Sequence, residues 1–171
     1  MGNDVSFEYR DYTEIGIKAE KEFIDAVIKL NPTIDIIKAT EQEDMLEHWD
    51  YMFNNIKIDV KARRHIGVLN ANGDRYTFLE LINRNGEKGS LYGKADYLAF
   101  EIVRQYLDSF LIVPRIELVK YVEQHLIDEF VIDQNKSVNK KYQGFNTNYV
   151  LTCVSLDELA MLPNSKLINK N

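Results

Sequence analysis

Hydrophobic residues recur at helical spacing along residues 14–30, with charged residues between them. The pattern predicts an amphipathic helix that ends before Asn31 and Pro32, and it places Glu20 at the edge of the apolar stripe. A second stripe predicts a helix over residues 115–127.

Several shorter segments alternate apolar and polar residues, which is typical of half-buried strands. Asn54 and Asn55 predict a turn between the second and third of them, so we expect a meander at the start of the sheet. Ser155 with Glu158 matches a capping box and predicts a short helix over residues 155–162. The predicted strands cover residues 33–40, 48–54, 57–62, 76–83, 91–103, 109–115 and 149–156.

The order of these elements predicts an α/β or α+β fold with a central mixed sheet flanked by helices. A chain of 171 residues with no visible linker predicts a single domain (residues 1–171) with its core in about residues 14–160. The polar segments 133–148 and 163–171 are expected to be mobile.

The composition is 45% hydrophobic and 28% charged, which is typical of a folded globular protein. Cys153 is the single cysteine, which excludes an internal disulfide and a cysteine zinc site. No apolar run reaches the roughly 18 residues of a spanning helix, and no signal-peptide pattern is visible. We therefore expect a soluble, cytoplasmic protein without membrane contact.

The net charge is −6, which argues against nucleic acid as a partner, but the charges are unevenly distributed. Residues 41–50 are strongly acidic, whereas residues 57–65 are mainly basic. The local field decides what a cleft attracts, so a polyanionic partner remains open.

Strand alternation over residues 57–62 places Lys57, Asp59 and Lys61 on one face. Asp50, on the preceding strand, lies beside Asp59 if the two strands pair as a hairpin. Two carboxylates with a backbone carbonyl, such as that of Val60, suit Mg²⁺ or Mn²⁺, which prefer oxygen ligands. The ammonium of Lys61 is placed to orient a water molecule and to offset charge on a phosphodiester.

These residues resemble the PD-(D/E)xK nuclease superfamily, whose core is a helix followed by a meander with an Asp and then an acidic-x-Lys strand. The matching residues are Asp50 and Asp59-Val60-Lys61, and Glu20 stands where many members have a helical acid. The segment "FLELINRNGEKGSLYGKADYLAF" resembles small, phage-encoded members, and the resemblance covers roughly residues 14–103. It implies a restriction-endonuclease-like core and a catalytic set of Glu20, Asp50, Asp59 and Lys61.

Further residues are candidates for substrate contact. Arg63 and Arg64 suit phosphate, and His65 and Lys57 lie in the same basic segment. Glu80 and Asp96 stand on later predicted strands. We interpret each as near the site or as a structural partner. An ordinary solvated strand face with a cross-strand ion pair is the alternative explanation for Asp59 and Lys61.

The sequence thus predicts a Mg²⁺-dependent deoxyribonuclease, with RNA as a further possible substrate and a dimer as a possible assembly. The alternative is a protein that keeps the nuclease fold without turnover and binds DNA or another protein. A phage-encoded member would act in the host cytoplasm.

Overall fold

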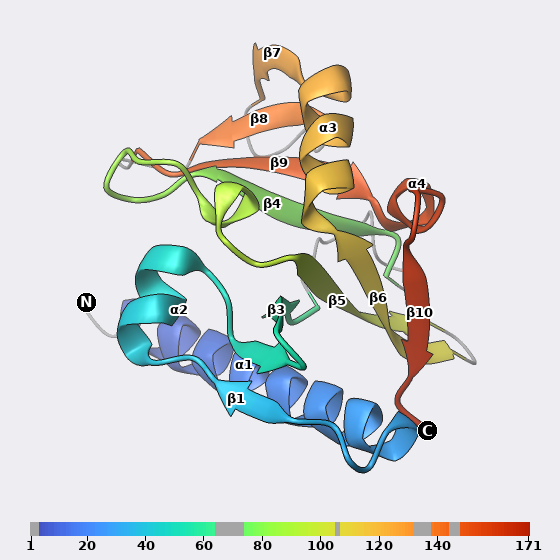
Figure 1. The fold of residues 1–171 in the computed structure, drawn as a ribbon. Coiled ribbons are helices and arrows are strands. Elements are labelled where there is room, and N and C mark those ends of the chain that lie inside the picture. Colours follow the sequence, from blue (N-terminus) through green and yellow to red (C-terminus); the bar gives the residue numbers. More distant parts are fainter. Residues whose placement is uncertain (1–3, 64–73, 105–106, 132–137, 144–147) are drawn as a thin grey trace.

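The computed structural model describes residues 4–63, 74–104, 107–131, 138–143 and 148–171. The fold is mixed α+β, with two mixed sheets and four α-helices in the part of the chain described (Figure 1). The helices are α1 (Asp4–Leu30), α2 (Glu41–Glu47), α3 (Arg115–His125) and α4 (Leu156–Ala160), together with the short 3-10 helix η2 (Ser90–Tyr92). No helix among these residues is long and apolar enough to cross a membrane.

The larger sheet has six strands in the order β1-β2-β3-β5-β6-β10. Its strands are β1 (Ile36–Lys38), β2 (Tyr51–Phe53), β3 (Ile56–Lys61), β5 (Tyr97–Arg104), β6 (Leu107–Pro114) and β10 (Lys166–Asn169). The pairs β1–β2 and β2–β3 are antiparallel, which confirms the expected meander, whereas β3 and β5 are parallel. Asn54 and Asn55 both have positive φ, as the tight turn between β2 and β3 requires.

The smaller sheet has four strands in the order β4-β9-β8-β7 and was not foreseen as a separate sheet. Its strands are β4 (Tyr76–Ile82), β7 (Ile127–Phe130), β8 (Lys140–Gln143) and β9 (Val150–Ser155). The predicted mixed sheet is therefore present as the larger sheet, and the smaller sheet is a second mixed sheet.

The larger sheet is covered on both faces. On one face α1 packs through Phe23, whose ring contacts Phe53 and Phe110 edge to face at 5.7 and 5.1 Å between centroids. The other face carries Leu98 and Phe100 into a core shared with the smaller sheet, α3 and α4. Figure 1 shows this layering, with α1 on one side of β5 and β6 and with α3 and the smaller sheet on the other.

The structure departs from the expected elements in several places. Residues 41–47 form α2, which was not predicted. Within the predicted strand 91–103, η2 precedes β5, which begins only at Tyr97. The segments expected to be mobile contain β8 and β10, because backbone pairing with β9 and with β6 orders them.

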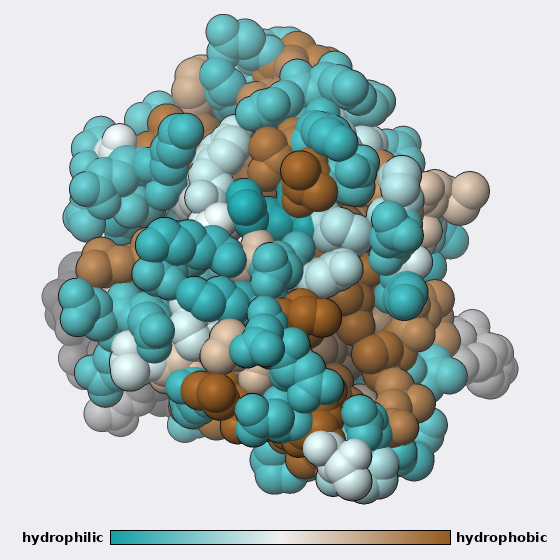
Figure 2. Space-filling model, in the orientation of Figure 1, coloured by the Kyte–Doolittle hydropathy of each residue, from teal (hydrophilic) through white to brown (hydrophobic). Residues whose placement is uncertain are grey.

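In Figure 2, hydrophilic residues dominate around α2, and hydrophobic ones gather over β6 and β10.

Candidate functional site

Asp50 lies immediately before β2, beside β3. Its backbone N–H donates to the carbonyl of Ile58 at 2.9 Å, which continues the β2–β3 ladder by one residue. Its carboxylate Oδ2 then accepts the N–H of Val60 at 2.6 Å. The Asp50 carboxylate therefore accepts an N–H that a backbone carbonyl would accept if β2 were longer. This hydrogen bond fixes the carboxylate next to Asp59.

Asp59 and Lys61 form an ion pair on β3, with Lys61 Nζ at 2.8 Å from Asp59 Oδ2. Asp59 is only 4% exposed, whereas 30% of the Lys61 side chain remains accessible. Asp59 Oδ2 is buried and makes no well-aligned hydrogen bond with any described residue. The predicted common face of the two residues is confirmed by this ion pair.

The ionisation of the site reflects its burial. Burial, followed by the nearby charge of Asp59, raises the pKa of Asp50 to about 8, although the Val60 N–H and Lys61 oppose this. Burial also raises the pKa of Asp59, against the effect of Lys61. Burial alone would lower the pKa of Lys61, but the charges of Asp59, Asp50 and Glu80 raise it above its ordinary value. Without a further cation, the folded protein therefore favours a proton on Asp50 at neutral pH.

Glu20 reaches the site from α1. Its Oε2 accepts a hydrogen bond from the Tyr51 hydroxyl at 3.2 Å, and its charge adds to the rise of the Asp50 pKa. The placement agrees with the predicted helical acid. The part of Tyr51 in the site was not predicted, although Tyr51 directly follows Asp50 and lies on a predicted strand.

The corner between α2 and β2 was also not foreseen as part of the site. His48 caps the C-terminus of α2 in the left-handed region, with φ 55°. Electrostatic interaction with His48 lowers the pKa of Asp59, and that with Asp44 raises it. Gly93 fits against this corner because a Cβ there would lie 2.7 Å from His48 Cβ. The capping box of Thr40 and Glu43 is the sequence signal that could have revealed α2.

Glu47 anchors the same corner. Its carboxylate contacts Lys94 at 2.8 Å, Lys57 at 3.1 Å and the Trp49 indole N–H at 3.1 Å. Hydrogen bonds from Lys94, then Lys57 and Trp49, lower its pKa to about 2. Glu47 thus fixes the segment that leads into Asp50.

The predicted phosphate contacts are placed unevenly. Lys57 already pairs with Glu47 and lies 4.5 Å from the centre of the Trp49 ring. Arg63 pairs through Nη2 with the buried Asp74 at 3.0 Å, while 41% of its side chain stays exposed. Arg64 and His65 lie outside the described residues.

Glu80 and Asp96 hold the surrounding elements. Glu80 Oε1 accepts the N–H of Ser90 at 3.0 Å, and Glu80 also acts on Lys61 through its charge. Asp96 Oδ2 accepts the N–H of Lys57 at 2.8 Å, and its own N–H donates to the Lys57 carbonyl at 2.8 Å. Asp96 therefore joins the start of β3 to β5, whereas Glu80 borders the site.

Within the described residues, no group of three or more His, Cys, Asp or Glu side chains is arranged to hold a metal ion. The donors that do converge are the carboxylates of Asp50 and Asp59. Both have pKa values that burial raises. This oxygen-only set fits a hard divalent cation such as Mg²⁺ that keeps several water ligands. Val60 enters the site through its N–H, and its carbonyl remains a predicted ligand.

The chain was compared with protein-family models, with curated proteins and with solved structures, and none of them matches.

Proposed function

We propose that this protein is a metal-dependent deoxyribonuclease with a restriction-endonuclease-like core, similar to small phage-encoded members of the PD-(D/E)xK superfamily. The observation that carries the proposal is the fixed position of the Asp50 carboxylate on the Val60 N–H, beside the buried Asp59–Lys61 pair. Two buried carboxylates held close together destabilise a protein through their mutual repulsion, so a site that concentrates them suggests a use.

The arrangement of elements supports the same proposal. A helix bearing Glu20 precedes an antiparallel meander, Asp50 immediately precedes its second strand, and Asp59 and Lys61 lie on its third. This is the order in which the superfamily arranges its helix, its Asp and its acidic-x-Lys strand.

The proposed chemistry assigns a role to each side chain. Asp50, Asp59 and the Val60 carbonyl would hold Mg²⁺ or Mn²⁺, which when bound withdraws charge from a phosphate oxygen and lowers the pKa of water. The ammonium of Lys61, which is partly exposed, donates to the attacking water and faces the charge that develops on phosphate. Glu20, oriented by the Tyr51 hydroxyl, is placed to accept a hydrogen bond from a water in the site.

DNA is the proposed substrate, and RNA is a further one. The exposed part of the Arg63 guanidinium, with Lys57, Arg64 and His65, is proposed to contact the phosphate backbone. We place the activity in the cytoplasm, or in the host cytoplasm if a phage encodes the protein.

A second proposal is a nuclease-fold protein without turnover that binds DNA or a protein. The favouring observation is that Lys57 and Arg63 are both already paired with carboxylates, which reduces the positive charge available to DNA. Such a protein would bind without cleaving.

The test is nicking of supercoiled plasmid by the parent protein and by Asp59→Asn and Lys61→Met, in Mg²⁺, Mn²⁺, Ca²⁺ and EDTA. We expect cleavage in Mg²⁺ and Mn²⁺ only, and a loss of at least about 100-fold in each variant, since each change removes several kcal/mol of transition-state stabilisation. Asp25→Asn, an exposed change on α1, serves as the matched control and should cleave like the parent. If the folded Asp59→Asn variant cleaves at the parental rate, the site is misassigned. Binding without cleavage by the parent would favour the second proposal.

A further inference from the structure

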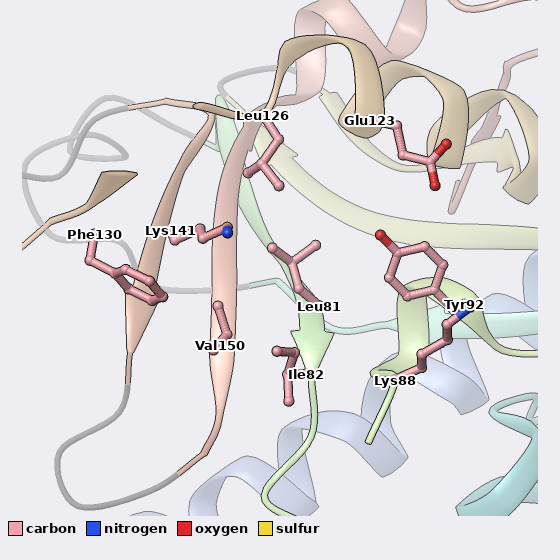
Figure 3. A pocket seen from close by; sticks show the side chains of 9 residues that line it. All are labelled: Leu81, Ile82, Lys88, Tyr92, Glu123, Leu126, Phe130, Lys141 and Val150. Carbon is pink, nitrogen blue, oxygen red and sulfur yellow. The ribbon is translucent and has the colours of Figure 1, made fainter. Parts of the chain in front are cut away.

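A pocket of about 420 Å³ lies on the smaller sheet, between that sheet, α3 and η2 (Figure 3). Nine residues line it: Leu81, Ile82, Lys88, Tyr92, Glu123, Leu126, Phe130, Lys141 and Val150. None of them belongs to the site of Asp50, Asp59 and Lys61. The volume falls within the range of pockets that bind small organic ligands, roughly 300–1,000 Å³.

The two ends of the pocket differ from its middle. Figure 3 shows Phe130 and Lys141 on one side and Tyr92, Lys88 and Glu123 on the other, with four aliphatic side chains between them. Leu81 and Val150 are buried in the sheet, whereas Phe130 is 53% exposed. An accessible aromatic ring next to an apolar floor offers a flat surface on which a planar group can stack.

Each aromatic ring is accompanied by a lysine. Lys88 Nζ lies 5.4 Å from the centre of the Tyr92 ring, and Lys141 Nζ lies 5.5 Å from that of Phe130. Lys141 also pairs with Asp128, whereas no ion pair of Lys88 is found among the residues that the structure describes. The Tyr92 end therefore has a cation that is available to an anion.

We propose that this pocket binds a nucleotide unit, with the base stacked on Phe130 over the apolar floor and the phosphate at Lys88. A base needs a ring surface and apolar contact, which Phe130 and the aliphatic side chains between the two ends offer. A phosphate needs an unpaired cation, which only the Lys88 end supplies among the described lining residues. A fatty acid would use the floor but not the rings.

Binding here is independent of the carboxylates on β3, so the inference stands whether or not the protein cleaves DNA. The unit can be a free mononucleotide or the phosphorylated end of a strand, because both present a base and a terminal phosphate. The two sources are separated by comparing their affinities.

The experiment is titration calorimetry of the full chain with dAMP, deoxyadenosine, inorganic phosphate and octanoate. We expect dAMP to bind about tenfold more tightly than deoxyadenosine, because its phosphate adds a charge-assisted contact. Phosphate and octanoate should bind far more weakly than dAMP. A short 5′-phosphorylated oligodeoxyadenylate that binds more tightly than dAMP identifies a strand end, and equal affinity identifies a free nucleotide.

Variants separate the two parts of the pocket. Lys88→Met should bring dAMP down to the affinity of deoxyadenosine, and Phe130→Leu should weaken both ligands by a similar factor. Both side chains are exposed, so the variants should fold, which circular dichroism checks. Lys120→Met on α3 is the matched loss of one surface lysine and should bind like the parent. Asp59→Asn should also bind dAMP normally. Equal binding of dAMP and deoxyadenosine by the parent, tighter binding of octanoate, or an unchanged Lys88→Met variant would overturn the proposal.

Discussion

Replacing Asp50 by Asn should stabilise the metal-free protein at neutral pH. The Asp50 carboxyl has an ordinary pKa of 3.8, which burial and then Asp59 raise to about 8 in the folded protein. Between these values the unfolded chain is ionised at this residue while the folded chain holds a proton. The free energy of unfolding therefore falls as the pH rises from about 4 to about 8.

The size of the effect follows from the shift. One pKa unit corresponds to about 1.4 kcal/mol, so the cost of Asp50 approaches a ceiling of about 4 kcal/mol at pH 7. Asn does not titrate, and its amide oxygen can still accept the Val60 N–H that Asp50 accepts at 2.6 Å. Water entry and the new NH₂ group reduce the gain, and we expect Asn to raise the free energy of unfolding by about 1–3 kcal/mol at pH 7.

The assay is urea unfolding at pH 4.5, 6 and 7.5 in EDTA, followed by circular dichroism and by the fluorescence of the buried Trp49. The advantage of Asp50→Asn should be small at pH 4.5 and grow with pH. Asp25→Asn on the exposed face of α1 should change stability by less than about 0.5 kcal/mol at every pH. Added Mg²⁺ should stabilise the parent more than Asp50→Asn. A difference that does not vary with pH, or a variant less stable than the parent at pH 7.5, would refute the reasoning.

Two further changes test the packing around the site. Gly93→Ala should destabilise the protein by about 1–3 kcal/mol in thermal melts and lower cleavage, because the new Cβ would lie 2.7 Å from His48 Cβ and displace the corner before Asp50. Gly16→Ala is the control, because a Cβ at Gly16 would have nothing within 4 Å. It should stabilise α1 by up to about 1 kcal/mol in the same melts. Lys170→Met should cost about 3 kcal/mol in urea unfolding, because it leaves the buried Glu101 without its cation at 2.6 Å. The exposed Lys18→Met is its control, and an equal effect of both would contradict the argument.

The elements and residues that could be predicted share a local cause. The facing of Asp59 and Lys61 follows from the two-residue period of a strand, and the turn at Asn54 and Asn55 fixes which residues of β2 and β3 meet. The position of Asp50 beside Asp59 therefore required only the sequence between them. The stripe of the first helix likewise located Glu20 at its edge.

What the sequence did not reveal depends on distant contacts or on backbone pairing. Helix α2 buries none of its residues, and Met45 is 73% exposed, so no apolar stripe marks it. Strand β10 also lacks a buried side chain and is held by its pairing with β6. The role of Glu47 depends on Lys94, which is 47 residues away, and no local pattern relates the two.

The order in which the chain visits its two sheets limits how either could be exchanged. It leaves the larger sheet after β3 to form β4, returns for β5 and β6, and leaves again for β7 to β9 before β10. Neither sheet is a continuous stretch of sequence. A recombination event or a designed graft that replaces the sheet with the pocket needs two separate insertions at matched positions. The carboxylates on β3 and the pocket on the smaller sheet are therefore expected to be inherited together.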